Sequence, residues 1–130
     1  MNIAKTILLA GLLTLGMACG YGSHATTPPS AGTMPNITAL VPNSTQAGST
    51  NNGITVNGTS FSGNAKVNWN GAALTTVFVS GNQLMATIPD ADVATAGTAA
   101  VTVTNPGMPG GLYGGGTSPE TSSAMTFTIN

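Results

Sequence analysis

From Pro35 to Asn130 the chain is a series of short segments in which apolar and polar residues alternate, and each segment ends at Gly, Asn or Pro. An alternation with a period of two is typical of β-strands that bury one face. It predicts strands at residues 37–41, 53–58, 66–69, 83–88, 98–104 and 124–129. The apolar positions of these strands predict a core made of Ile54, Val56, Val67, Trp69, Leu84, Ala86, Ile88, Ala99, Val101, Val103, Met125, Phe127 and Ile129.

The connections between the segments contain residues that are typical of turns. Asn70-Gly71 predicts a type I′ hairpin turn, in which both residues have positive φ, followed by a strand at 72–76 or slightly later. The segment 90–97 has an acidic start and a final Gly, and it predicts a single helical turn. No other segment has the pattern of a helix.

For one predicted strand, at residues 76–80, the residue pattern does not indicate which face is buried. Val77 and Val79 compete with Phe78 for the core side. With this strand, about seven strands fit into the segment from Pro35 onward, which predicts an all-β, immunoglobulin-like β-sandwich. The sandwich has no pair of cysteines, so packing alone must hold its core.

Residues 1–18 have the features of a signal peptide that directs export. Lys5 supplies a positive charge, residues 7–15 are mostly apolar, and small residues precede Cys19. The apolar segment is much shorter than the about 20 residues that span a bilayer. We therefore expect the segment to be cleaved and not to remain as a transmembrane helix.

The residues around the cleavage site, Gly16-Met17-Ala18-Cys19, resemble the lipobox of bacterial lipoproteins, in which the cysteine is joined to diacylglycerol and begins the mature protein. The match departs from the usual motif at Gly16, where lipoboxes carry Leu. The resemblance implies lipidation of Cys19, and Gly20 after it implies the outer membrane or the cell surface. Ordinary cleavage before Cys19 or before Thr26 is the alternative, and it would give a soluble secreted or periplasmic protein.

Residues 19–34 are rich in Gly, Ser, Thr and Pro and have no apolar periodicity, which predicts a flexible tether before a domain at 35–130. Charged residues are scarce after the signal peptide, where Lys66 is the only Lys or Arg. Nucleic-acid binding requires clustered Lys and Arg, so that class of partner is excluded. The nearly neutral surface also gives little charge repulsion against self-association.

The chain has few residues that could carry catalysis or hold a metal. Its only His, His24, lies in the tether and its only Cys, Cys19, lies at the membrane end, so a Ser-His or Cys-His pair cannot form in the domain. Asp90 and Asp92 could bind a cation together, but carboxylates at the start of a helical turn are more often a cap and a solvated charge. Glu120 has no evident partner. We therefore predict no enzyme activity, no catalytic residue, no metal site and no cofactor.

Residues 105–118 form an unusual Gly- and Pro-rich segment around Met108, Leu112 and Tyr113. Phosphate-binding Gly-rich loops lead from a strand into a helix, whereas this segment leads to another strand, so phosphate binding is not predicted. A hairpin loop that exposes Leu112 and Tyr113 is expected, either as a plain connection or as a contact site for a sugar or a protein. Trp69 is expected in the core and not on a ligand platform.

The order of the strand and turn segments resembles that of an IPT/TIG domain. The matching segments are 35–43, 47–48, 53–61, 84–89, 97–106 and 125–129. The resemblance implies an immunoglobulin-like fold of the kind found in cell-surface receptors, in some transcription factors and in bacterial surface proteins, without a catalytic residue. The DNA-binding branch of the family depends on basic loops that this chain lacks. Gly53 and Gly58 are expected where the backbone is tight, and Phe61 is expected in the core.

These observations predict a non-enzymatic lipoprotein module, at the cell surface or in the periplasm, that binds or spaces a protein or a carbohydrate. Its expected partners are the membrane, through lipidated Cys19, and a protein or polysaccharide. One alternative is a structural subunit that self-assembles through edge strands of the sandwich into an envelope or filament structure. Another is an accessory to a polysaccharide-degrading enzyme encoded elsewhere.

Overall fold

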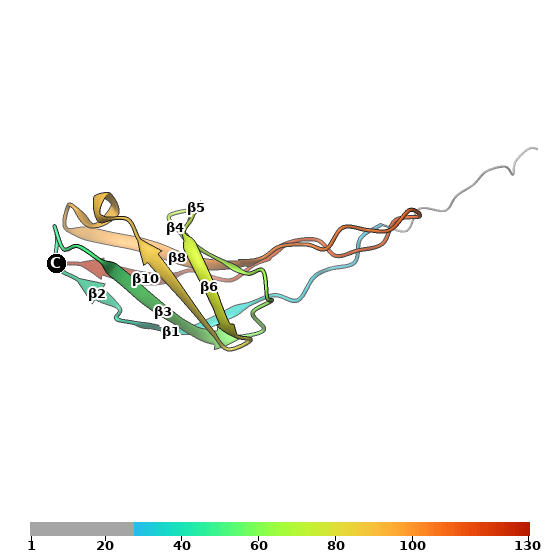
Figure 1. Ribbon diagram of the computed structural model, residues 1–130, viewed down its shortest axis with the longest axis horizontal. Coiled ribbons are helices and arrows are strands. Elements are labelled where there is room, and N and C mark those ends of the chain that lie inside the picture. The colour runs from blue at the N-terminus through green and yellow to red at the C-terminus, as the bar shows by residue number, and fades with distance from the viewer. Residues whose placement is uncertain (1–27) are drawn as a thin grey trace, which may run out of the picture.

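The protein is described by a computed structural model over residues 28–130, which form two β-sheets packed face to face (Figure 1). The predicted signal peptide, Cys19 and His24 lie outside the described residues. Within the described range, no helix is both long enough and apolar enough to cross a membrane.

The first sheet has four strands and the second has six, three of which are only two residues long. The order in the first sheet is β1 (Asn36–Val41), β3 (Asn52–Thr59), β7 (Gln83–Ile88) and β6 (Thr75–Ser80). The order in the second sheet is β2 (Ser44–Thr45), β10 (Met125–Ile129), β8 (Gly97–Asn105), β4 (Lys66–Trp69) and β5 (Ala72–Ala73), and β9 (Glu120–Thr121) pairs with β8. Neighbouring strands are antiparallel except β2 and β10. The edges of the first sheet are therefore β1 and β6.

The predicted all-β immunoglobulin-like sandwich is confirmed. Seven of the strands in residues 28–130 have four or more residues, as the alternation pattern predicted. The strands β4 and β7 have the predicted bounds, and most of the others differ by one residue at an end. A period of two is a strong signal in β3, β7 and β8 because each of these strands has one buried and one wet face.

The strand predicted after the turn begins at Ala72 as expected, but it is not continuous, because the chain changes sheets at Leu74. Residues before Leu74 form β5 in the second sheet, and residues after it form β6 in the first. The Leu74 side chain is buried, and its backbone N–H donates a 2.8 Å hydrogen bond to the Val67 carbonyl oxygen. A single inward-pointing residue thus links the two layers.

The predicted turns are present, with one difference in their detail. Asn70 and Gly71 have φ of 49° and 91°, the positive values that the type I′ turn requires. The helical turn is the 3₁₀ helix η1 (Asp90–Val93), and it has no side-chain cap. The predicted capping role of Asp90 or Asp92 is therefore wrong.

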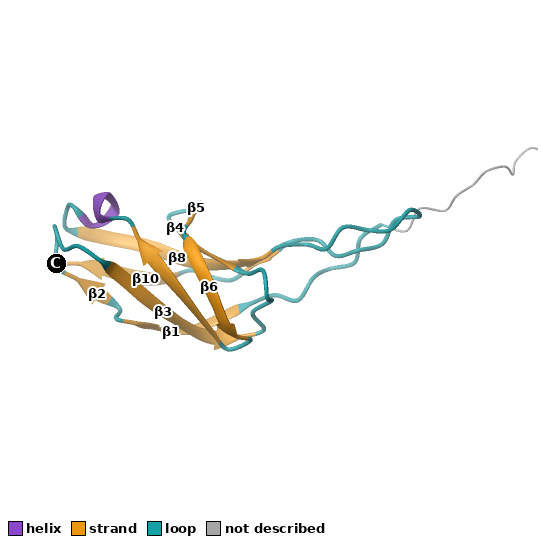
Figure 2. Ribbon diagram, in the orientation of Figure 1, coloured by secondary structure: helices purple, strands orange, loops and turns teal. Residues whose placement is uncertain are grey.

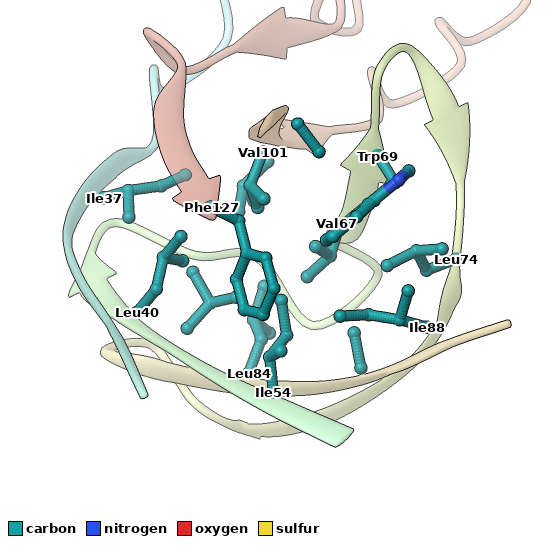
Figure 3. Packing of buried hydrophobic residues seen from close by; sticks show 14 of the residues in the cluster. Ile37, Leu40, Ile54, Val67, Trp69, Leu74, Leu84, Ile88, Val101 and Phe127 are labelled. Carbon is teal, nitrogen blue, oxygen red and sulfur yellow. The ribbon is translucent and has the colours of Figure 1, made fainter. Parts of the chain in front are cut away.

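The core lies between the two sheets and contains the predicted apolar positions, of which only Met125 is partly buried (Figure 3). Trp69 on β4 and Phe127 on β10 are in contact across the second sheet, with ring centroids 5.1 Å apart and planes at 59°. Phe61, which follows the bend after β3, is buried as expected. The side chains of both sheets therefore interdigitate in one core.

The two glycines expected at tight backbone positions differ. Both lie within β3. A Cβ at Gly58 would overlap the Asn36 carbonyl oxygen on β1 and lie 2.5 Å from the Phe61 ring. A Cβ at Gly53 would meet nothing closer than 3.9 Å, so the expectation is confirmed for Gly58 and wrong for Gly53.

Candidate functional site

The two carboxylates considered for a cation site lie on η1 and are exposed. Asp90 Oδ1 accepts hydrogen bonds from the Asn51 backbone N–H at 3.2 Å and from Asn52 Nδ2 at 3.5 Å. Asp90 therefore joins η1 to the start of β3. Among residues 28–130, no group of three or more His, Cys, Asp or Glu side chains is placed to hold a metal ion.

A hairpin of residues 106–119 projects from the end of β8, and we call it the arm (Figure 2). Met108 and Thr117 pair across it, with the Thr117 N–H donating to the Met108 carbonyl oxygen at 3.0 Å. Gly111 and Gly114 close its tip through two backbone hydrogen bonds of 2.9 and 3.1 Å. The two residues between them are Leu112 and Tyr113, so the tip of the arm consists of these two predicted contact residues.

The end of the predicted tether runs along the arm (Figure 1). The Ser30 N–H donates to the Gly116 carbonyl oxygen at 3.1 Å, and the Ser118 N–H donates to the Ser30 carbonyl oxygen at 2.9 Å. Ser30 pairs with Thr117 in the parallel direction, so the chain before Ser30 continues toward the tip. The arm and the start of the described chain therefore extend together from the same end of the sandwich.

Two glycines of the arm lie where a side chain would collide with the opposite segment of the hairpin. Gly116 has a φ of +84°, and a Cβ on it would overlap the Met108 carbonyl oxygen. A Cβ on Gly107 would overlap the Thr117 carbonyl oxygen. Only residues without a side chain let the backbone segments approach so closely, which accounts for the composition without any phosphate site.

Asn105, the last residue of β8, fixes the base of the arm. Its side chain is only 5% exposed. Its Nδ2 donates hydrogen bonds of 2.7 Å to the carbonyl oxygens of Thr33 and Ser60, and its Oδ1 accepts a 2.9 Å bond from the Ser62 N–H. One amide therefore holds the tether, the bend after β3 and the end of β8 together.

A small cavity lies beside Asn105, lined by Gly32, Thr33, Ser62, Asn105, Pro106, Met108, Thr117 and Ser118. Ser62 Oγ is buried there without a hydrogen-bond partner. The volume of about 150 Å³ is well below the roughly 300 Å³ at which small-molecule pockets begin. The cavity at the base of the arm is therefore smaller than a typical pocket for a drug-sized ligand.

A second group of exposed apolar side chains lies around the free edge of the first sheet. We call it the β6 patch and define it as Val77, Phe78, Val79 and Met85, all of which are exposed. Val77 pairs with Met85 and continues a row across the outer face of the sheet through Thr55 to Val41. The sequence left the buried face of this strand open, and the structure exposes both alternatives because β6 is an edge strand.

The residues singled out in the sequence are thus separated in space. Leu112 and Tyr113 are 88% and 61% exposed at the tip of the arm, which follows β8, whereas Asp90 and Asp92 precede β8 at its other end. Trp69 is in the core, as predicted. The sequence did not predict the role of Asn105 or the exposure of the β6 patch.

The fold defines the class of the protein as an immunoglobulin-like β-sandwich. A family model, that of the IPT/TIG domain, matches residues 35–129, and the chain therefore belongs to the IPT/TIG family. TIG domains are immunoglobulin-like modules that are usually non-enzymatic and act in binding or scaffolding, commonly through protein interactions. A search of curated proteins finds no match to the chain.

Proposed function

We propose that this protein is a non-enzymatic surface lipoprotein in which lipidated Cys19 anchors a single TIG domain and the β6 patch contacts a partner. The observation that carries the binding role is the distribution of exposed apolar side chains. Apart from Val41 and Met34, the large ones in residues 28–130 lie either in the β6 patch or on the arm. Such clusters on a soluble domain mark interaction sites more often than scattered single residues do.

The β6 patch is better suited to a protein than to a carbohydrate. Val77 and Met85 offer aliphatic and thioether side chains on the outer face of the sheet. Phe78, the only aromatic ring of the patch, pairs with buried Leu84 and so lies on the opposite face at the free edge. Sugar sites rely on aromatic faces and on polar groups placed to hydrogen-bond hydroxyls. None of the residues that pair between β6 and β7 is charged, so these two strands impose no electrostatic requirement on the partner.

The anchor is tested by the mass of the mature N-terminus. We expect the wild-type chain to begin at Cys19, to carry the added mass of the lipid and to fractionate with membranes. The Cys19→Ser variant should lack that mass and should no longer be processed as a lipoprotein. Ser23→Ala is the matched control, because it leaves the cysteine intact. An unmodified start at Cys19 or at Thr26 would contradict the anchor and favour a soluble protein.

A second candidate function, self-assembly through an edge strand, is favoured by the difference between the two edges of the first sheet. β1 is flanked by Pro35 and Pro42 and contains a register shift between Ile37 and Ala39, which are devices that block edge pairing. β6 contains no Pro and no charge, and its own register shift comes only after Phe78. Pairing of β6 with β6 of a second copy would join two first sheets into one continuous sheet.

Lysine substitutions at the two edges separate self-assembly from partner binding. For a soluble form that begins at residue 20 and so lacks the lipidated cysteine, light scattering should show larger species if β6 pairs, and Val77→Lys should return the protein to monomers. Val41→Lys, on the same face but on β1, should leave assembly unchanged. A partner that binds the sheet face should instead be weakened by both variants. Monomers at high concentration in the wild type would contradict assembly.

A further inference from the structure

The tip of the arm is the most exposed apolar feature in the described part of the chain. Leu112 is 88% exposed, Tyr113 is 61% exposed, and Met108 behind them is 68% exposed. Neither the arm nor residues 28–34 contain a charged residue. The nearest charge in sequence is Glu120, at the base of the arm in β9.

The chain itself places this tip next to its predicted point of attachment. Because Ser30 pairs in parallel with Thr117, residue 28 lies about level with Gly115, close to the tip (Figure 1). Residue 28 lies nine positions after Cys19 in the sequence. A segment of that length spans at most about 30 Å when fully extended, and about 15–18 Å on average if it is a flexible coil. The tip is thus at the end of the described domain where the chain from the proposed anchor enters.

The geometry points to a second membrane contact: the Leu112–Tyr113 tip of the arm inserts into the lipid surface that holds Cys19. This inference rests on the proposed lipid anchor. Leu supplies an apolar side chain for the acyl boundary, and Tyr has an apolar ring and a polar hydroxyl, the combination that membrane interfaces favour. The absence of charge on the arm removes the main cost of approaching the acyl chains.

Insertion of two side chains would be too weak to hold a free protein on a membrane. An anchored chain differs, because the tether keeps the tip at a high effective concentration near the surface. The tip would therefore fix the orientation of the sandwich, with the arm toward the membrane and η1 at the far end (Figure 2).

Fluorescence quenching by lipid tests the inference with the full lipidated chain. A Tyr113→Trp variant is reconstituted into vesicles of phosphatidylethanolamine and phosphatidylglycerol, with or without brominated acyl chains. Brominated lipid should lower the emission of the introduced tryptophan by about twofold, since insertion brings the ring to the acyl boundary. Native Trp69 is buried in the core and supplies a constant background measured in the wild type.

Two further variants make the result specific. Thr95→Trp places the same reporter on an exposed site before β8, at the opposite end of that strand from the arm, and should not be quenched. Adding Leu112→Asp to Tyr113→Trp should abolish the quenching, because a carboxylate opposes insertion. Melting temperatures equal to that of the wild type would establish that each variant is folded.

The outcomes separate the inference from the anchor. If the chain does not float with vesicles, the anchor is wrong and the inference falls with it. If the chain floats but brominated lipid leaves the Tyr113→Trp emission unchanged, the anchor stands and the inference is overturned. An emission change that appears only with a soluble glycan or a protein would likewise overturn the inference, and would favour a contact site for a sugar or a protein at the tip.

Discussion

Replacing Trp69 with alanine is expected to lower the free energy of unfolding by about 3–5 kcal/mol. The side chain is 4% exposed, and its ring packs against Phe127, which is completely buried. The substitution would remove this aromatic contact and leave a cavity between the two sheets, which the surrounding strands can fill only in part. Small domains have a total stability of roughly 5–15 kcal/mol, so a large share of it would be lost.

Chemical denaturation measures this effect directly. Circular dichroism must follow the transition, because Trp69 is the only tryptophan and its fluorescence is lost in the variant. We expect a lower midpoint with an unchanged slope, which indicates lost stability and not a changed surface area of unfolding. Trp69→Phe retains a ring against Phe127 and should cost less. An unchanged midpoint in Trp69→Ala would contradict the core role and return Trp69 to consideration as a ligand platform.

The sequence predicted the core well because burial and strand period are both local properties. Val101 and Val103 on β8, for example, alternate with half-buried or exposed residues, and the same alternation appears in the chain. Trp69 was assigned to the core on the same grounds. Where one face of a strand is covered and the other is wet, the alternation of residues therefore predicts which side chains are buried.

The parts that the sequence did not predict depend on distant partners. Val77, Phe78 and Val79 are consecutive and apolar, and no feature of the neighbouring sequence indicates that β6 is an edge strand. The hydrogen bond of Ser30 to Gly116 joins residues 86 positions apart. The compositions of residues 28–34 and of the arm both indicate irregular structure, but only the fold brings these two segments side by side.

The second large effect is expected at Asn105. Its replacement by alanine should lower the free energy of unfolding by about 2–4 kcal/mol. Each buried polar group left unpaired costs about 1–3 kcal/mol, and water can relieve part of this cost. The carbonyl oxygens of Thr33 and Ser60 and the N–H of Ser62 would all lose this partner. Water can enter through the adjacent cavity, which is why the three losses should not add fully. An Asn at the end of a strand before Pro106 gave no sign of this role in the sequence.

Asn105 should also control whether residues 28–34 stay against the arm, since its Nδ2 bonds to Thr33. In Asn105→Ala we expect faster amide exchange at Ser62 and faster proteolysis near Thr33, both of which hydrogen exchange and limited digestion detect. Asn105→Asp keeps the acceptor for Ser62 but places an oxygen against two carbonyl oxygens, and should be at least as destabilising. Asn64→Ala, at an exposed position, is the matched control and should change stability by less than about 0.5 kcal/mol. Equal exchange in Asn105→Ala and Asn64→Ala would show that the tether is held by other contacts.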